Sequence, residues 1–241
     1  MIETVGLSKL YGDKRAVDRL TLRVEPGEVM GFLGPNGSGK TTTIRLLMGL
    51  LRPSEGHASI RGRDCHADAV ALKREVGYLP DEPFLYPYLS GHEVLELVAG
   101  LHGYTPRESR ARAREQAERF GLGPVADGFT VTYSHGTKKR LALAMALIHE
   151  PQVLIMDEPT NGLDPRGARE MRETIARLAA GGRTIFLSTH LLEAAERLCH
   201  RVAIIRGGVL QAVGTPDDLR AKYAASADAT LEELFLKATE E

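Results

Sequence analysis

The sequence predicts an α/β fold with a mainly parallel sheet, and three stretches carry this prediction. A glycine-rich loop at 34–42 follows the apolar run 29–33 and precedes a helix-like segment. The run 153–156 is continuously apolar and leads directly to two carboxylates, and the run 184–188 leads to a histidine. Continuously apolar strands are typical of parallel sheets buried on both faces, and the carboxyl ends of such strands are where ligands bind.

The first strands of the chain have a different pattern. Residues 2–7 and 20–24 alternate between apolar and polar side chains, as strands with one buried face do. Residues 25–27, Glu-Pro-Gly, predict a turn into the next strand. We therefore expect an antiparallel β-subdomain at the N-terminus. Tyr11 falls in the loop between the two strands, where an isolated tyrosine is more often a packing residue than a ligand contact.

The glycine-rich loop matches the pattern G-x-x-x-x-G-K-[ST] between a strand and a helix. Its glycines allow backbone N–H groups to turn inward around phosphate oxygens, while Lys40 reaches the β- and γ-phosphates and Thr41 faces Mg²⁺. The positive end of the following helix adds to the attraction for phosphate. The candidate nucleotide-binding residues are Gly34, Pro35, Asn36, Gly37, Ser38, Gly39, Lys40, Thr41 and Thr42.

The character of the chain changes between residues 81 and 150, where the pattern is mostly helical. Two helix-start signals fall here, at Ser90 with Glu93 and at Thr105 with Glu108. We expect a helical lobe inserted into the α/β domain. Its second helix carries five arginines and few large apolar residues. This composition indicates a solvated face rather than a nucleic-acid surface.

A basic run at 138–140 opens the apolar helix 141–148. We expect Ser134 to cap this helix and the basic side chains to lie on the surface. A proline then ends the helix, and the following strand ends in Asp157 and Glu158. Adjacent carboxylates at the end of a buried strand are costly unless a cation meets them. In a chain with a phosphate loop, the simplest cation is Mg²⁺ with its nucleotide.

The last third of the chain continues the α/β pattern. Asp164 is predicted to cap a helix that begins at a proline and runs to Ala180. His190 follows the next strand, and its position alone is as compatible with a structural role as with a ligand contact. The remaining predicted elements are a hairpin of 201–205 and 209–213 and short helices that begin at Thr215 and Thr230.

Charge and cysteine content argue against several classes of function. The chain carries 31 Lys and Arg against 32 Asp and Glu, so no overall positive field attracts nucleic acid. Cys65 and Cys199 have neither C-x-x-C spacing nor a histidine cluster, which predicts reduced thiols in a cytosolic protein and no metal site built on them. The N-terminus lacks a leader pattern, and no apolar run approaches about 18 residues, so we expect neither secretion nor a membrane span.

These motifs, in this order and spacing, resemble the nucleotide-binding subunit of ABC transporters over nearly the whole chain. The glycine loop looks like the Walker A motif of that family, and 153–158 looks like its Walker B motif. The resemblance implies a RecA-like P-loop NTPase core at 1–80 and 151–218 that includes the antiparallel β-subdomain. It also implies a helical subdomain at 81–150 and a short C-terminal helical tail at 219–241.

The resemblance further implies a role for each candidate residue at the strand ends. Asp157 would hold Mg²⁺ through water, Glu158 would be the general base for the attacking water, and His190 would contact the γ-phosphate. The implied catalytic residues are therefore Lys40, Glu158 and His190. Two more positions follow from the family pattern: an aromatic residue that stacks on adenine, Tyr11, and the D-loop of the dimer interface at 161–164, which includes Asp164.

Two motifs depart from the family's commonest form. The signature L-S-G-G-Q appears as Tyr-Ser-His-Gly-Thr at 133–137. By analogy, Ser134 and Gly136 would contact the γ-phosphate of ATP held by the opposite subunit. At the Q-loop, Asp81 replaces the expected glutamine, so it could bind Mg²⁺ more strongly but cannot donate a hydrogen bond to the attacking water. Both features are similar to ATPases of ABC-2-type exporters, which points to export.

The family pattern implies two protein partners. A second ATP-binding subunit, most simply another copy, would complete the site. An integral membrane permease subunit would hold this cytoplasmic chain at the inner face of the cell membrane. Residues 80–88, which include Phe84, Leu85, Tyr86 and Tyr88, either dock the permease or pack the helical lobe.

Two other functions share the phosphate loop. Soluble ABC ATPases that act on nucleic acid or ribosomes usually carry two cassettes or long inserted coiled coils, and this sequence shows neither. A P-loop small-molecule kinase shares the first motif but not the paired carboxylates, the signature-like run or the histidine. We therefore expect ATP as substrate, Mg²⁺ as cofactor and no nucleic-acid partner.

Overall fold

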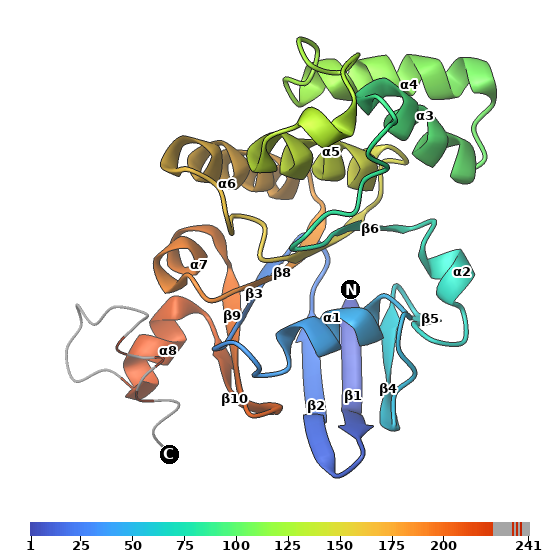
Figure 1. Ribbon diagram of the computed structural model, residues 1–241. Coiled ribbons are helices and arrows are strands. Elements are labelled where there is room, and N and C mark those ends of the chain that lie inside the picture. The colour runs from blue at the N-terminus through green and yellow to red at the C-terminus, as the bar shows by residue number, and fades with distance from the viewer. Residues whose placement is uncertain (224–232, 234, 236, 238–241) are drawn as a thin grey trace.

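The computed structural model describes residues 1–223, 233, 235 and 237, and Figure 1 shows two sheets with helices packed around them. The smaller sheet has the strand order β2-β1-β4-β5, and all of its pairs are antiparallel. The antiparallel start that the sequence predicts is therefore confirmed. The strands of this sheet are β1 (Ile2–Tyr11), β2 (Lys14–Val24), β4 (Glu55–Ile60) and β5 (Arg63–Asp64).

The larger sheet is parallel except at one edge. Its strand order is β10-β9-β3-β8-β7-β6, in which β9 and β10 form an antiparallel hairpin and the other neighbours pair in parallel. The mainly parallel sheet expected from the apolar runs is thus confirmed. Its strands are β3 (Val29–Leu33), β6 (Val76–Leu79), β7 (Val153–Asp157), β8 (Thr184–Thr189), β9 (Arg201–Arg206) and β10 (Val209–Gly214).

Both faces of the parallel sheet are covered, which is why its strands are apolar throughout. In β7, Val153 and Ile155 pack into a core cluster that also contains residues of β1, β2 and α1 (Lys40–Leu47). Leu154 packs on the opposite face with residues of α5 (His135–Leu147) and α6 (Pro165–Ala180). Helix α1 therefore packs between the two sheets, and α5 and α6 cover the other face (Figure 1).

Helices α3, α4 and α5 form the upper part of the molecule in Figure 1. A third core cluster joins these helices. As predicted, Ser90 and Glu93 exchange a pair of hydrogen bonds at the start of α3, and Thr105 and Glu108 do so at the start of α4. The bounds are Gly91–Leu101 for α3 and Pro106–Arg119 for α4, and the 3₁₀ helix η1 (Thr130–Thr132) precedes α5.

The structure departs from the sequence-based expectations at several points. Tyr11 does not lie in a loop: it is the last residue of β1 and pairs with Lys14, because the first two strands continue to a tight hairpin. Strand β5 and two helices, α2 (Ala69–Leu72) and α7 (Leu192–Leu198), were not predicted, because such short elements show little periodicity. The helix predicted to begin at Thr215 is α8, which spans Pro216–Tyr223. The start predicted at Thr230 lies outside the described residues.

None of the helices in the described part of the chain combines the length and the apolar character that a membrane span requires.

Candidate active site

The glycine loop connects β3 to α1, and its backbone explains three of its glycines. Gly37 has φ +79° and Gly39 has φ +110°, conformations that residues with a Cβ rarely adopt. At Gly34 the limit is space, because an added Cβ would lie 2.4 Å from the carbonyl oxygen of Ile205. Gly39 immediately precedes α1, so the loop N–H groups and the positive end of this helix face the same region.

Lys40 is buried at the base of this loop. Its Nζ donates hydrogen bonds to the carbonyl oxygens of Gly34, at 2.7 Å, and Pro35, at 3.2 Å. Ser38 Oγ is buried and has no hydrogen-bond partner among the described residues, whereas Thr41 is exposed. A buried hydroxyl without a partner in a loop of inward-facing donors fits a phosphate oxygen as its missing partner.

The two carboxylates at the end of β7 are buried in different surroundings. Asp157 Oδ1 accepts a hydrogen bond from Ser188 Oγ, and Asp157 forms no salt bridge among the described residues. Glu158 has φ +45°, and its N–H donates to the carbonyl oxygen of Ser188 at 3.1 Å. Burial and the Asp157 carboxylate raise the pKa of Tyr78, on the neighbouring strand β6, to about 12. Two buried carboxylates, Asp157 and Glu158, therefore lie at this strand end.

Lys40, Glu158 and His190 come together in the structure. Glu158 Oε1 lies 3.4 Å from Lys40 Nζ, and Glu158 Oε2 lies 3.0 Å from His190 Nδ1. The backbone N–H of His190 also donates to Glu158 Oε2, at 3.3 Å. Strand β8 lies between β3 and β7 in the sheet, so the carboxyl ends of three adjacent parallel strands bring these side chains together.

These residues fit a magnesium ion that accompanies a nucleotide. Magnesium is usually bound through one or two protein groups, with phosphate oxygens and water completing its shell. Asp157 supplies a buried carboxylate and Thr41 an exposed hydroxyl beside the phosphate loop. Asp81 is placed differently: both of its carboxylate oxygens accept hydrogen bonds from Asn161 Nδ2, at 3.1 and 3.3 Å, and Oδ1 also accepts one from Lys139. Coordination of Mg²⁺ by Asp81 would require these contacts to open.

Lys139 is a second residue, after Tyr11, whose position differs from the sequence-based expectation. It was expected on the surface with the rest of its basic run, but it is fully buried, and burial lowers the pKa of its ammonium despite the nearby Asp81 carboxylate. The helical spacing contains the signal that could have located it. Ala142, Leu143 and Ala146 follow Lys139 at intervals of three, four and seven, and all are buried on the inner face of α5.

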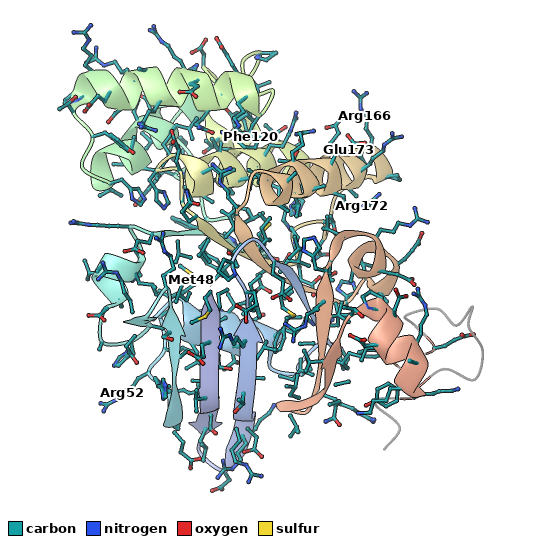
Figure 2. The ribbon with its side chains drawn as sticks, turned by 180° about the vertical axis from the view of Figure 1, so that it is seen from behind. Met48, Arg52, Phe120, Arg166, Arg172 and Glu173 are labelled. Atoms are coloured by element: carbon teal, nitrogen blue, oxygen red, sulfur yellow. The ribbon has the colours of Figure 1, made fainter. Side chains whose placement is uncertain are left out.

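The signature-like run lines a cavity that no residue of the glycine loop lines. Ser134 caps α5, as predicted, by accepting a hydrogen bond from the N–H of Thr137. A Cβ added at Gly136 would lie 3.6 Å from Leu163 Cδ2, and His135 Nε2 lies 3.3 Å from the carbonyl oxygen of Asn161. Ser134, His135, Gly136 and Leu163 line a cavity of about 790 Å³ along α5 and α6. The lining also includes Asp164 but no residue of the glycine loop. Figure 2 labels three others that line it: Phe120, Arg166 and Glu173.

The remaining predicted residues lie outside the group formed by Lys40, Glu158 and His190. Tyr11 is half exposed, with Lys9 Nζ 5.4 Å from the centre of its ring. Asp164 caps α6 by accepting a hydrogen bond from the N–H of Gly167 at 2.9 Å. In the segment 80–88, Leu85 packs against the helical core cluster, whereas the aromatic side chains are exposed. The exposed aromatic residues are Phe84, Tyr86 and Tyr88.

A phosphate loop that faces an acidic strand end and a histidine defines the chain as a P-loop nucleoside triphosphatase. The sequence model of the ABC transporter family matches residues 17–161, more than half of the chain. The chain therefore belongs to the ABC transporter family, and it is one of the family's ATPase subunits.

Similar proteins in this family are named as ATP-binding proteins. The chain is 45% identical over 217 residues to the daunorubicin resistance ATP-binding protein DrrA3 of Streptomyces coeruleorubidus, covering 90% of this chain and 69% of that protein. It is 37% identical over 219 residues to the linearmycin resistance ATP-binding protein LnrL of Bacillus subtilis, with coverages of 91% and 70%. It is also 37% identical to the probable multidrug ABC transporter ATP-binding protein YbhF of Escherichia coli, but spans only 41% of that protein.

Solved structures agree with this fold. A structure described as the ATP-binding subunit of an ABC transporter superposes with a TM-score of 0.90 at 33% identity and covers 99% of both chains. A dimeric, post-hydrolysis structure of the ATP-binding cassette MJ0796 with bound ADP and Pi gives a TM-score of 0.82 at 25% identity, covering 89% of this chain and 98% of that one.

Proposed function

We propose that two copies of this chain bind MgATP at a shared interface and hydrolyse it, and that their closure and reopening drive export through a separate membrane permease subunit. The observation that carries this proposal is the separation of two half-sites on one chain. Lys40, Glu158 and His190 meet at the strand ends, whereas Ser134 and Gly136 line a different cavity. A second copy would bring its signature face to the phosphate loop of the first.

The chemistry rests on positioning and charge. Lys40 and the loop N–H groups would stabilise the charge that develops on the transferring phosphoryl group. Glu158 would orient and deprotonate the attacking water, with His190 Nδ1, 3.0 Å from its carboxylate, fixing its direction. Magnesium, held by Thr41 and through water by Asp157, would neutralise charge on the β- and γ-phosphate oxygens.

Other residues would complete the bound state. We assign adenine stacking to Tyr11, whose ring is half exposed at the end of the first hairpin. Ser134 and Gly136 would contact the γ-phosphate in the partner copy, and Asp164 would lie at the dimer interface. The helical segment 81–150, which has its own core cluster, would move as a unit relative to the α/β core.

The exposed aromatic residues of 80–88 are our candidate for contact with the permease. Phe84 is 80% exposed and Tyr88 is 78% exposed, and Phe84 meets Tyr86 edge-on with ring centres 5.9 Å apart. A compact group of exposed aromatic side chains is typical of a protein interface. Docking there would hold the chain as a peripheral subunit at the inner face of the cell membrane. The resistance proteins among the relatives support export as the direction.

The substitution Glu158→Gln tests the hydrolytic part of the proposal. Glutamine keeps the shape of the side chain but cannot accept the proton, so we expect kcat to fall by roughly 10²–10⁴-fold while ATP binding is kept. With ATP, this variant should accumulate as a closed dimer in light scattering. The matched control is Glu118→Gln on the exposed face of α4, which should turn over like the wild type. Wild-type-like turnover of Glu158→Gln would reject the assignment of the base.

A mixing experiment tests the shared site. Lys40→Ala would disable the phosphate loop and Ser134→Arg the signature face, so each variant alone should be inactive. Mixed dimers should regain activity, because one of their two sites combines an intact loop with an intact signature. If the mixture stays as inactive as its components, the site is not shared between two copies.

A further inference from the structure

Helix α5 carries a buried ammonium group, that of Lys139, which connects the helix to the Q-loop and to the segment that follows β7. Lys139 Nζ donates hydrogen bonds to Asp81 Oδ1 at 3.2 Å, to the carbonyl oxygen of Glu158 at 2.8 Å and to the carbonyl oxygen of Asn161 at 3.1 Å. An ammonium group has three N–H donors, so these contacts satisfy it completely. Asn161 Nδ2 closes the network by donating to Asp81.

Packing alone does not account for this lysine. Its neighbours along the inner face of α5 are apolar, and its side chain is fully buried. Burying an ammonium is unfavourable unless it is paired and hydrogen-bonded, and an apolar residue of similar size is often at least as stabilising. The contacts that the charge makes are therefore the feature to explain.

One of those contacts holds a strained residue. Glu158 has φ +45°, a left-handed conformation that is unfavourable for a residue with a Cβ and that persists only where its surroundings fix it. Its N–H donates to Ser188, and its carbonyl oxygen accepts from Lys139. Together these hydrogen bonds fix both peptide groups of Glu158, and with them the direction of its carboxylate toward Lys40 and His190.

The same network explains the aspartate at the Q-loop position. The neutral glutamine expected there would leave Lys139 without its salt bridge to the Q-loop, whereas Asp81 supplies a carboxylate at 3.2 Å and also accepts from Asn161. The departure at position 81 and the buried lysine at position 139 therefore form one paired feature.

We propose that Lys139 is a positioning residue for ATP hydrolysis: paired with Asp81, it holds the Glu158 turn and so orients the carboxylate that activates water. This inference rests on the proposed role of Glu158 as the general base. It predicts that loss of the charge pair disturbs the chemical step more than the binding of ATP.

The test compares Lys139→Met with Lys138→Met, the adjacent lysine on the same helix, in purified full-length protein. For Lys139→Met we expect kcat to fall about 10- to 100-fold, because a small displacement of a catalytic group has effects of this size. Its KM and its dissociation constant for a fluorescent ATP analogue should stay within about threefold of wild type. Lys138→Met should match the wild type in all three quantities.

Asp81→Asn provides a second variant that keeps the size of the side chain. It should lower kcat in the wild-type background and have little further effect in the Lys139→Met background, because its partner charge is already gone. If Lys139→Met does not fold, Asp81→Asn alone decides, and a kcat within twofold of wild type overturns the proposal. A folded Lys139→Met with wild-type kcat, or equal effects of Asp81→Asn in both backgrounds, also overturns it.

The two proposals fail in different ways. If Glu158→Gln abolishes turnover and Lys139→Met does not reduce it, the general base stands and the positioning role is wrong. If Glu158→Gln turns over like the wild type, the base itself is misassigned.

Discussion

A pair of stacked histidines predicts how stability depends on pH. His102, at the end of α3, and His149, just after α5, have ring centres 3.8 Å apart and ring planes within 8° of parallel. Burial, and next the neighbouring His102, lower the pKa of His149 from 6.5 to about 4. Protonation of His149 would place a charge in a partly buried site beside another histidine.

The sign follows from the direction of this shift. Well above pH 6.5 His149 is neutral in both the folded and the unfolded chain, so its contribution to stability is complete. As the pH falls from 6.5 toward 4, the unfolded chain takes up the proton first, and the free energy of unfolding decreases. A shift of this size corresponds to roughly 3 kcal/mol, and because the ring is only partly buried we expect about 1–2 kcal/mol.

Urea unfolding at pH 7 and pH 5 measures this contribution. His149→Phe keeps a flat ring to stack on His102 and cannot be protonated. We expect the decrease in unfolding free energy between the two pH values to be smaller in this variant by about 1 kcal/mol than in the wild type. His66→Gln, at an exposed position, is the control and should keep the wild-type decrease. An unchanged pH dependence in His149→Phe would refute the reasoning.

Two further predictions concern packing and thiol reactivity. A Cβ at Gly77 in β6 would lie 2.3 Å from the carbonyl oxygen of Ala146, so Gly77→Ala should destabilise the fold by about 2–3 kcal/mol in urea unfolding. Gly100 in α3 has open space around it, and Gly100→Ala should instead stabilise by about 0.5–1 kcal/mol; destabilisation by both would contradict this reading. Burial raises the pKa of Cys65 and Cys199 to about 12, so a thiol reagent at pH 8 should react with both only after denaturation, and rapid reaction of the native protein would be the contrary result.

The parts of the structure that sequence reasoning predicted well depend on local patterns. The capping boxes at Ser90 and Thr105 and the cap at Asp164 formed as expected, because each involves residues three positions apart. The glycine loop also has its expected place between a strand and a helix, because its backbone conformation is encoded in its own glycines. Glu158 and His190 each follow a predicted parallel strand, and they meet because parallel strands present their carboxyl ends at one edge of the sheet.

The parts that it missed depend on distant partners. The local sequence predicts a loop at Tyr11, but Tyr11 belongs to β1. The pairing of β1 with β2, rather than local propensity, extends the strand to that residue. Lys139 was placed on the surface because its charge resembles that of its neighbours in sequence. Its partner Asp81 lies 58 positions away, and Glu158 lies 19 positions further along the chain.

The sequence by itself determined that this chain holds a nucleotide phosphate beside an acidic strand end, because both are short contiguous motifs. Only the tertiary structure decided that Asp81 faces Lys139 and Asn161, and that Ser134 lines a cavity that Lys40 does not line. The physical reason is that hydrogen bonds between segments far apart in the chain depend on how α5 packs against the sheet. No local pattern of charges specifies that packing.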